Sequence, residues 1–520
     1  MRPEKRARSH RGEATGFWLT IVWHPDVTRV GEAVSFQSNI KLSRLEPEFS
    51  RHLRGGVAAT LSPQSGKRPL GDPNVSRRPL ELSVASRGEL EVRAPASGSD
   101  VAIDGVPITK ARVLSPAELA RGVVIALASR VVLVVRQSSM NRGGGEHLGL
   151  VGTSAEVAWM VEQIERVAAS DAHVLLRGAT GTGKELVAAA IHEQSTRRSG
   201  AFVAVNMTTL PAPTASSQLF GHRRGAFTGA DSDHAGFFGA ANGGSLFLDE
   251  IGETPTDVQA MLLRALESSA VTPVGSAKPS EVDVRIISAT DADLEAAAHE
   301  NRFRSPLLHR LAGYQIDLPT LADRREDVGP LLVHFLRDEL RKVSSIALDP
   351  RAPTAPMWLS AEQAARLAVH RWPGNVRQLR NLARRLAIAC GDAEVVSDDE
   401  LRRGLATGRG QSQDEKDSIT TTARPVKRRP DDVSDRELVD ALRANAWKTS
   451  AAATELGISR TSLYALIERC DLVRKARDLM AAEINSALAA SGGDTAAAAT
   501  VLEVSERGLK LRIKELEASG

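Results

Sequence analysis

The spacing of apolar residues changes along the chain. Up to residue 137, apolar residues form short runs with turn residues between them. From 148 to 315, unbroken apolar runs alternate with stretches of helical spacing, and after 316 helical spacing predominates. Short strands divided by turns favour a β-sandwich, whereas buried runs alternating with helices favour a parallel sheet with crossover helices. We therefore predict a multidomain chain with an N-terminal β-sandwich, a central α/β layer and helical parts after it.

The apolar runs predict the positions of the strands and helices, and changes in composition predict the domain boundaries. Strands are expected at 17–23, 80–84, 90–92, 101–103, within 123–135, and at 174–176, 202–205, 246–248 and 284–289; helices are expected at 328–342, 361–370 and 375–390. The predicted segments are a disordered tail at 1–15, a sensory sandwich at 16–137, a flexible linker at 138–147, an α/β subdomain at 148–315, a helical lid at 316–405, a linker at 406–433, and two helical repeats at 434–472 and 473–520.

Composition argues against several classes of protein. The formal net charge is only +3, so any basic surface must be local. Cys390 and Cys470 lie far apart, which favours two buried thiols over a disulfide framework or a cysteine-rich metal site. No apolar run reaches the roughly 18 residues of a spanning helix, and the basic N-terminus is not followed by an apolar segment with a cleavage site. We expect a cytoplasmic protein.

A glycine-rich loop follows the apolar run that ends at Leu176. Its residues are Gly178, Ala179, Thr180, Gly181, Thr182, Gly183, Lys184 and Glu185. Glycines allow turns with φ > 0 that aim several N–H groups at phosphate oxygens, and the following helix directs its positive end at them. Lys184 would then reach the β- and γ-phosphate oxygens of a triphosphate. The alternative is a coincidental glycine turn.

A second pattern makes that alternative weaker. Residues 243–250, GGSLFLDE, form an apolar strand that ends in two carboxylates, Asp249 and Glu250. In this pattern the first carboxylate holds Mg²⁺ through its water shell and the second polarises the attacking water. ATP and Mg²⁺ are therefore the expected ligands of the central layer, and ATP hydrolysis is the expected reaction.

A hexapeptide without an evident local structural role lies between the two patterns. Its residues are Gly225, Ala226, Phe227, Thr228, Gly229 and Ala230. Two glycines and three small residues around one phenylalanine describe a mobile loop that presents a single apolar side chain. The alternative is a buried turn with Phe227 in the core.

The three motifs GATGTGKE, GAFTGA and GGSLFLDE resemble those of the AAA+ ATPases that activate transcription with sigma-54, the bacterial enhancer-binding proteins. The resemblance covers roughly residues 149–390. It implies that the hexapeptide loop, raised by ATP, engages sigma-54 and remodels the closed complex of RNA polymerase, with Phe227 and Thr228 as contact residues. It also implies active sites completed by a neighbouring subunit, and hence a ring, expected to be a hexamer.

Further positions acquire roles from the same resemblance. Asn206 resembles the residue that restrains the catalytic Glu250, and Thr290 resembles sensor I. Arg377, within the motif WPGNVRQL, resembles sensor II, which contacts bound nucleotide from the lid. Asn375 in that motif is expected to cap the helix that begins there.

Arg304 and Arg310 align with the arginine-finger helix of the family. They would reach the γ-phosphate bound by a neighbouring subunit, where such a cation is worth about 10³ to 10⁵ in rate. The alternative is a pair of solvated surface arginines.

Three residues depart from the family pattern. Asp291 replaces the asparagine that follows sensor I and cannot donate the hydrogen bond of an amide, so we expect altered coupling between hydrolysis and loop movement. Arg223 stands where an acidic residue precedes the loop, which leaves the ion-pair partner of the loop unassigned. Pro306 replaces an acidic residue and is expected to reshape the finger helix.

The C-terminal part repeats itself at a spacing of 46 residues. Ala451–Thr454 recurs as Ala497–Thr500, and Leu456 and Leu463 recur as Leu502 and Leu509. A repeat of this length is one supersecondary unit made twice, here helix, tight turn, helix. Residues 449–469 resemble the Fis-type helix-turn-helix usual in the enhancer-binding proteins, so we expect a tandem helix-turn-helix that binds double-stranded DNA.

The second helix of such a motif lies in the major groove. Candidate DNA contacts are Arg460, Thr461, Ser462 and Tyr464 in the first copy, and Arg507 and Lys510 in the second, more basic copy. Glu503 occupies the turn position of Gly457, and a non-glycine residue with φ > 0 costs about 1 kcal/mol or more. We therefore expect a weaker or structural role for the second copy.

The first domain resembles the forkhead-associated (FHA) domain, a β-sandwich that reads phosphothreonine, in the segment DPNVSRR at 72–78 and in Asp104-Gly105. The resemblance implies phosphopeptide contacts by Arg44, Ser76 and Arg77. Pro79 and Asp104 differ from the residues usual in that family. The alternative is a sensory sandwich that binds no phosphopeptide.

Taken together, the sequence predicts an ATP-hydrolysing transcriptional activator that binds enhancer DNA and remodels sigma-54 RNA polymerase. Asp291, Pro306 and Arg223 leave a second possibility open, a DNA-binding regulator in which ATP only switches oligomerisation. A third is an AAA+ remodeller of some other target, against which the intact hexapeptide argues.

Overall fold

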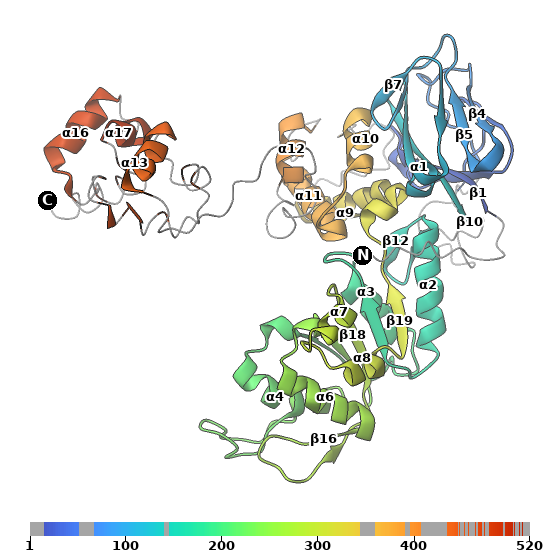
Figure 1. Ribbon diagram of the computed structural model, residues 1–520. Coiled ribbons are helices and arrows are strands. Elements are labelled where there is room, and N and C mark those ends of the chain that lie inside the picture. The colour runs from blue at the N-terminus through green and yellow to red at the C-terminus, as the bar shows by residue number, and fades with distance from the viewer. Residues whose placement is uncertain are drawn as a thin grey trace. The chain divides into compact units, whose positions relative to one another are not determined.

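The computed structural model describes residues 15–50, 67–139, 145–343, 359–389, 396–406 and 434–445, and short stretches or single residues from 447 to 512. The chain divides into two compact units, Met1–Ser412 and Gln413–Gly520 (Figure 1). None of the helices in these described parts is long and apolar enough to cross a membrane.

The N-terminal part of the first unit is mainly sheet, in agreement with the coarse prediction. A six-stranded antiparallel sheet has the order β2-β1-β10-β9-β6-β7 and a four-stranded sheet the order β3-β4-β5-β8. The strands are β1 (Thr15–Trp23), β2 (Ala33–Phe36), β3 (Ile40–Leu42), β4 (Leu80–Val84), β5 (Leu90–Arg93), β6 (Val101–Ile103), β7 (Val106–Ile108), β8 (Ala111–Leu114), β9 (Val123–Leu127) and β10 (Val131–Ser139); the short helices are η1 (Val27–Arg29), η2 (Ser86–Gly88) and α1 (Pro116–Arg121).

Both sheets contribute to one buried cluster. It includes Leu19 of β1, Leu82 of β4, Val92 of β5 and Leu133 of β10, all fully buried. These side chains alternate with the opposite face along each strand, as the pleat requires. The expected run 123–135 is two strands joined by a tight turn, in which Ala128 and Ser129 have positive φ.

Both ends of the flexible linker predicted at 138–147 belong to strands. Ser138 and Ser139 belong to β10, and β11 (Gly145–His147) pairs with β12 (Leu150–Gly152). Backbone hydrogen bonding to neighbouring strands therefore continues into the segment that composition alone marked as a linker, and residues 140–144 lie outside the described residues.

The central part is a five-stranded parallel sheet with helices, as predicted for an α/β subdomain. Its strand order is β14-β15-β18-β13-β19. The strands are β13 (Val174–Arg177), β14 (Phe202–Asn206), β15 (Ser245–Asp249), β18 (Arg285–Thr290) and β19 (Tyr314–Asp317), with a small pair β16 (Ala270–Val271) and β17 (Ser280–Glu281). The helices are α2 (Ala155–Ala168), α3 (Lys184–Glu193), η3 (Met207–Thr209), α4 (Ala212–Phe220), α5 (Gly236–Ala240), η4 (Ile251–Glu253), α6 (Thr256–Ser268), α7 (Leu294–His299) and α8 (Ser305–Leu311).

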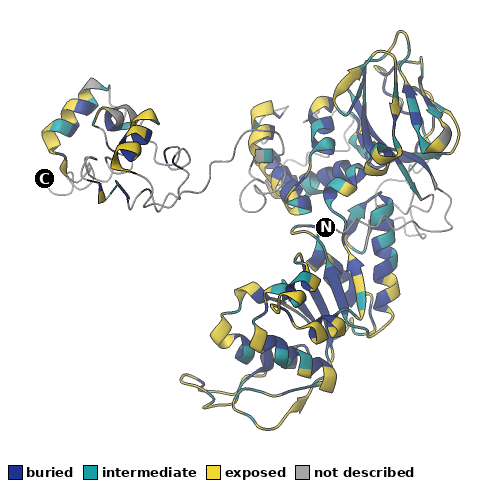
Figure 2. Cartoon of the chain, in the orientation of Figure 1, coloured by how far each residue is buried: buried dark blue, intermediate teal, exposed yellow. Residues whose placement is uncertain are grey.

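Strands of this sheet read as unbroken apolar runs because both faces are covered. Leu246, Phe247 and Leu248 of β15 are all buried, and Figure 2 shows the buried residues running along the strands. Leu246 and Leu248 lie in one hydrophobic cluster and Phe247 in another, on opposite sides of the sheet.

The predicted helical lid follows the sheet. It comprises η5 (Leu321–Asp323), η6 (Arg325–Asp327), α9 (Val328–Val343), α10 (Ala361–Val369), α11 (Asn375–Ala389) and α12 (Asp398–Ala406). Ser360 and Gln363 form a capping box that starts α10. Trp372, fully buried, donates its indole N–H to the carbonyl of Leu367 at 3.0 Å and so fixes the turn into α11.

The described residues of the second unit include three helices, α13 (Asp435–Ala444), α16 (Ala481–Ala490) and α17 (Thr495–Val501). They contribute to two separate buried clusters, one from Leu438 to Val473 and one from Leu479 to Leu509. Equivalent positions of the 46-residue repeat serve both cores, since Leu463 in the first and Leu509 in the second are fully buried. Cys470 is a buried free thiol, whereas Cys390 lies outside the described residues.

Candidate nucleotide site and presentation loop

The parallel register brings the predicted catalytic residues to one edge of the central sheet. Asn206 pairs with Asp249 at the carboxyl ends of β14 and β15, and Arg177, just before the glycine loop, pairs with Thr290 at the end of β18. Ligands of open α/β sheets bind at this edge. The glycine loop, both acidic residues, Asn206 and the sensor candidate Thr290 therefore meet in one place.

The glycine loop takes the conformation that its glycines allow. Gly181 and Gly183 have φ of 80° and 105°. Thr182 is buried and donates through its hydroxyl to the carbonyl of Ala179 at 2.8 Å, which closes the turn. The α3 helix begins at Lys184, so its N-terminal N–H groups face the loop.

Lys184 lies under the loop rather than in solvent. Its Nζ donates to the carbonyl of Gly178 at 3.0 Å and is 3.8 Å from Oε1 of Glu250. The side chain is only 7% exposed, so the ammonium is held by a few fixed partners. This position is suitable for a cation that binds phosphate oxygens next to a general base.

The two carboxylates at the end of β15 point in different directions. Glu250 has φ of 52°, a left-handed conformation that turns its side chain toward Lys184. Asp249 accepts from the amide Nδ2 of Asn206 at 3.4 Å. The amide of Asn206 thus contacts Asp249 in this structure, whereas the family resemblance had assigned it to Glu250.

Sensor candidate Thr290 lies buried at the end of β18. Its carbonyl accepts from the N–H of Gly178 at 3.2 Å, and its hydroxyl oxygen accepts from the N–H of Ala292 at 3.0 Å. The next residue, Asp291, accepts from the hydroxyl of Thr180 at 2.5 Å. The carboxylate that departs from the family pattern therefore binds the glycine loop directly.

The surroundings raise the pKa of Glu250. Burial is the largest cause, and the nearby carboxylates of Asp291 and Asp249 act in the same direction. Lys184 and the backbone N–H of Asp291 oppose this shift by stabilising the ionised form. A carboxyl with a raised pKa beside phosphate-binding groups is typical of a general base.

A magnesium ion fits the oxygen donors at this edge. Asp249 offers a carboxylate, and Glu185 at the first turn of α3 is an exposed carboxylate where serine or threonine is commoner. Within the described part of the chain there is no cluster of three His, Cys, Asp or Glu side chains arranged to bind a metal. Mg²⁺ usually needs only one or two carboxylates, completed by phosphate oxygens and water.

The lid contacts the glycine loop through the turn before α11. The N–H of Arg377 donates to the carbonyl of Gly181 at 3.3 Å, which places this sensor candidate beside the loop. Asn375, buried and with φ of 48°, donates to the carbonyl of Thr180 at 3.0 Å and accepts from the N–H of Leu321 at 3.0 Å. Its side chain therefore joins the loop to the lid, a role that the expected helix cap did not include.

The arginine-finger candidates lie at the two ends of α8, both exposed. Nε of Arg304 donates to the carbonyl of Thr256 at 3.4 Å, and Nε and Nη2 of Arg310 donate to the carbonyl of Leu266 at 3.1 and 3.0 Å. Both are held against α6 by backbone carbonyls rather than by carboxylates. Pro306 is accommodated in the first turn of α8, where its missing N–H costs nothing.

The hexapeptide forms a closed loop on a rigid base. At the base, His222 and His234 exchange backbone hydrogen bonds at 2.9 Å, and in the loop the N–H of Gly225 donates to the carbonyl of Ala230 at 2.8 Å. Phe227 is 44% exposed, and its ring contacts that of His222 with centroids 5.0 Å apart. The alternative of a buried turn with Phe227 in the core is therefore wrong.

The unassigned ion-pair partner of the loop is Asp233. Arg223 lies 2.5 Å from Oδ2 of Asp233, and the N–H of Arg224 donates to Oδ1 at 2.7 Å. The acidic group therefore lies after the loop instead of before it. Both ion-pair partners are 55% exposed, so the pair adds little to the stability of the fold. Its main effect is to orient the base of the loop.

Two of the N-terminal candidate residues lie together in the first domain. The N–H of Arg44 donates to the carbonyl of Ser76 at 3.2 Å, and the hydroxyl oxygen of Ser76 accepts from the N–H of Arg78 at 2.9 Å. Arg77 is exposed beside them. Asp104 lies elsewhere, 3.6 Å from Arg325 of the lid. The DNA candidates Arg460, Thr461, Ser462, Tyr464, Arg507 and Lys510 lie outside the described residues.

Comparison with known families gives consecutive matches. Residues 150–317 match the Sigma-54 interaction domain, 322–418 the AAA+ ATPase lid domain, and 430–468 the Bacterial regulatory protein, Fis family. The predicted AAA+ P-loop ATPase domain with a helical lid is thereby confirmed. The matches leave the FHA-like assignment of the first domain untested.

Individual relatives match about half of the chain or more. The chain is 38% identical over 316 residues to the hydrogenase transcriptional regulatory protein HoxA of Cupriavidus necator, covering 60% of this chain and 64% of HoxA. It is 42% identical over 240 residues to the sigma54-dependent transcriptional activator SfnR of Pseudomonas putida, covering 46% of this chain and 63% of SfnR. A structure of NtrX from Brucella abortus in complex with ADP is 32% identical, with 62% and 69% of the two chains covered and a TM-score of 0.45.

The chain spans less than two thirds of the length of HoxA and SfnR. The three matched family models follow one another between residues 150 and 468. This chain therefore carries a sigma-54 interaction domain, an AAA+ ATPase lid and a Fis-family segment, in that order.

Proposed function

We propose that this chain is an ATP-hydrolysing transcriptional activator that binds enhancer DNA and remodels the closed complex of sigma-54 RNA polymerase. The observation that carries the proposal is the half-exposed Phe227, presented on a closed loop within a sigma-54 interaction domain. An exposed phenylalanine on a loop of small residues is costly to keep without a partner. The Fis-family segment supports DNA as a second partner.

The proposed chemistry uses the groups at the sheet edge. Glu250 accepts a proton from the water that attacks the terminal phosphorus of ATP, and the bond to the β–γ bridging oxygen breaks to give ADP and phosphate. Lys184 binds the phosphate oxygens, and bound Mg²⁺, held by Asp249 through water, would neutralise charge on them. Arg304 and Arg310, exposed on α8, would complete the site of a neighbouring subunit in a ring, for which we propose a hexamer.

Two substitutions test this function separately. Glu250→Gln should bind ATP but lose turnover by about 10²- to 10⁴-fold, because the general base is lost. Phe227→Ala should keep ATP turnover but fail to open a sigma-54 promoter. Val113→Ala, at a comparably exposed apolar residue of β8, is the matched control and should change neither property. Promoter opening by Phe227→Ala at the wild-type rate would contradict the proposal.

A second candidate is a DNA-binding regulator in which ATP binding only switches oligomerisation. Asp291 favours it, because its carboxylate beside the base raises the pKa of Glu250 and so lowers the fraction of ionised base at a given pH. Steady-state ATPase assays decide between the two candidates. ATP binding and assembly without turnover in the wild-type chain would select the second.

For the first domain we propose phosphothreonine recognition by Arg44, Ser76 and Arg77. The proximity of Arg44 to Ser76 supports it, since one cation and one hydroxyl next to exposed arginines suit a phosphate. A phosphothreonine peptide library should yield ligands that bind the wild-type chain and lose affinity with Ser76→Ala. Equal binding of the unphosphorylated forms of those peptides would reject the proposal in favour of a sandwich that reads no phosphate.

A further inference from the structure

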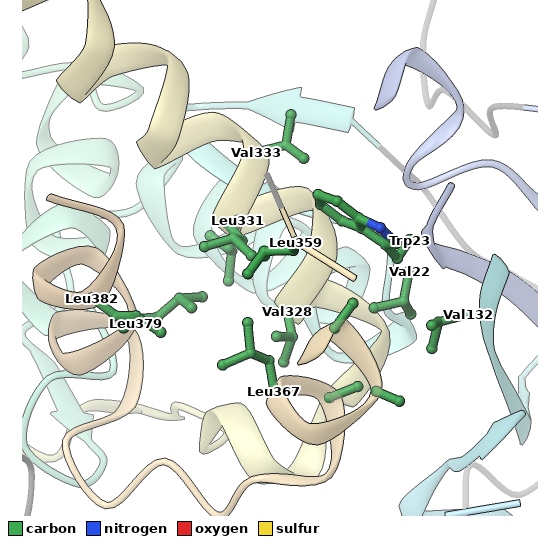
Figure 3. Close-up of a cluster of buried hydrophobic side chains, with 14 of the residues drawn as sticks. Val22, Trp23, Val132, Val328, Leu331, Val333, Leu359, Leu367, Leu379 and Leu382 are labelled. Carbon is green, nitrogen blue, oxygen red and sulfur yellow. The ribbon is translucent and has the colours of Figure 1, made fainter. Parts of the chain in front are cut away.

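The outer face of the six-stranded sheet is buried against the lid. Along β10, Val131, Leu133 and Val135 pack between the two sheets, whereas Val132 and Val134 on the opposite face belong to the hydrophobic cluster of the lid. Members of that cluster from the sheet domain are Val22, Trp23, Val30, Val124, Val132 and Val134, and members from the lid include Val328, Leu331, Leu336, Leu359 and Leu367. Figure 3 shows Trp23 and Val22 facing the lid side chains.

Backbone also approaches backbone closely at this interface. A Cβ on Gly329, in the first turn of α9, would collide with the carbonyl oxygen of Val22 at the end of β1. A Cβ on Gly31, which has φ of 91°, would only touch the side chain of Pro330 at 3.4 Å. A helix normally disfavours glycine, so Gly329 indicates that the strand and helix are in direct contact.

Buried charges connect the sheet domain to the lid and also to α2 of the α/β subdomain. Arg136 of β10 is 7% exposed and forms ion pairs with Glu326 of the lid at 3.1 Å and with Glu156 of α2 at 2.6 Å. Arg325 of the lid donates to the carbonyl of Gly122 at 2.9 Å. Removing one partner of a buried ion pair is destabilising, so the pair of Arg136 and Glu326 favours the arrangement in which the sheet packs on the lid.

The lid side of this interface continues to the nucleotide site. Asp327, next to Glu326 and fully buried, accepts from the N–H of Thr153 at 2.5 Å and from that of Ser154 at 2.9 Å. At the other end of the same segment, Asn375 links the N–H of Leu321 to the carbonyl of Thr180 in the glycine loop. The sheet domain is thus connected to the phosphate-binding loop through the lid.

We propose that the first domain is a structural part of the lid: the sheet domain, with described residues 15–50 and 67–139, and the lid helices α9, α10, α11 and α12 behave as one body and move together over the nucleotide site. The sheet domain then fixes the position of the lid, and any ligand that reorients the sheet changes the nucleotide site. Only the coupling to nucleotide rests on the proposed ATPase function. The shared body itself does not.

Hydrogen–deuterium exchange of the full-length chain tests this inference. Arg136→Gln should increase exchange in α10 by about 100-fold, because the buried ion pair between Arg136 and Glu326 is lost. Arg130→Gln is the matched control: it removes the ion pair with Asp72, 3.1 Å away within the sheet domain, and should leave α10 unchanged. Faster exchange in β1 and β10 with an unchanged α10 would overturn the proposal.

Gly329→Ala serves as a second variant in case Arg136→Gln does not fold. Because its Cβ would collide with the carbonyl oxygen of Val22, it should increase exchange in both β1 and α10, although alanine by itself favours α9, the helix that contains it. Unchanged or slower exchange in α10 would overturn the shared body. In a further arm, Mg²⁺ and a non-hydrolysable ATP analogue should change the exchange of α11 and β10 together. A change in α11 alone would overturn the coupling, and no response anywhere in the chain would count against the ATPase function instead.

Discussion

At the scale of single residues, Asp291 is one of the groups that raise the pKa of Glu250, after burial as the largest cause. The family pattern has an amide at this position, and the carboxylate here both binds Thr180 and adds negative charge beside Glu250. The substitution was evident from the sequence, and we predicted that it alters the coupling between hydrolysis and loop movement. The contact with Thr180 could not be predicted, because it depends on how the glycine loop folds against the end of β18.

The pKa shift gives a prediction with a definite sign. Burial and the neighbouring carboxylates raise the pKa of Glu250, so the ionised base is lost at a higher pH than for an ordinary glutamate when the pH falls. Asp291→Asn removes one of these charges while its amide oxygen still accepts from Thr180. The acid limb of the pH–ATPase profile should therefore move to lower pH. An unchanged limb in steady-state assays would show that Asp291 does not act on Glu250.

Asp233 is an ion-pair partner that matching of sequence motifs did not identify. The comparison with the family pattern placed the missing acidic group before the loop, where Arg223 stands. The structure places it ten residues later, on the returning arm of the same loop. A search for a compensating carboxylate within the hairpin would have found it, because both arms are adjacent once the hexapeptide closes.

At the scale of elements, the apolar pattern predicted the central strands well and their partners incompletely. Unbroken runs such as Leu246–Leu248 are typical of strands covered on both faces, and they are. The same reasoning applies to Val131–Val135, an unbroken run in an antiparallel sheet, which requires a cover on its outer face. That signal was present in the sequence, but it did not reveal which element supplies the cover.

The junction between the glycine loop and α11 gives a prediction at this scale. Asn375→Asp keeps the acceptor for the N–H of Leu321 but turns the donor to the carbonyl of Thr180 into a repelling oxygen. An unsatisfied buried group costs about 1 to 3 kcal/mol, so the KM for ATP should rise by about 5- to 150-fold. Gln378→Glu is the matched control in the same helix, since the side-chain N–H of Gln378 donates within the lid, to Leu405. An equal effect of both variants on the KM would refute a specific role of Asn375.

At the scale of the whole molecule, the sequence predicted the order of the domains, but it did not predict that the first domain packs on the lid. Glycines at 143–145 suggested a flexible linker, and short β runs suggested a detached sensory sandwich. The structure instead joins the sheet domain to the lid. Trp23 and Val134 are buried in the hydrophobic cluster that contains the lid residues, not in the cluster between the two sheets. Interfaces between domains depend on three-dimensional adjacency, which local periodicity does not encode.

The tandem C-terminal repeats lead to a prediction about DNA binding by the full-length chain. We expect the first copy to read sequence and the second to add backbone affinity. Arg460→Ala should reduce discrimination between operator and random DNA by about 1 to 3 kcal/mol, whereas Lys510→Ala should lower the slope of log affinity against log salt by about 1. Binding titrations at several salt concentrations measure both. Identical effects of the two substitutions would reject this division.

The shared core of sheet and lid also limits how such a protein can be rearranged by recombination. A sensory domain that is joined to the rest of a protein only by a flexible linker can be exchanged between proteins, because cutting the linker exposes no buried surface. Here the removal of the sheet domain would expose Leu331 of the lid and would remove the ion pair between Arg136 and Glu326. A chimera that transplants the sheet to another motor should therefore be viable only when the helices beneath it are transplanted as well.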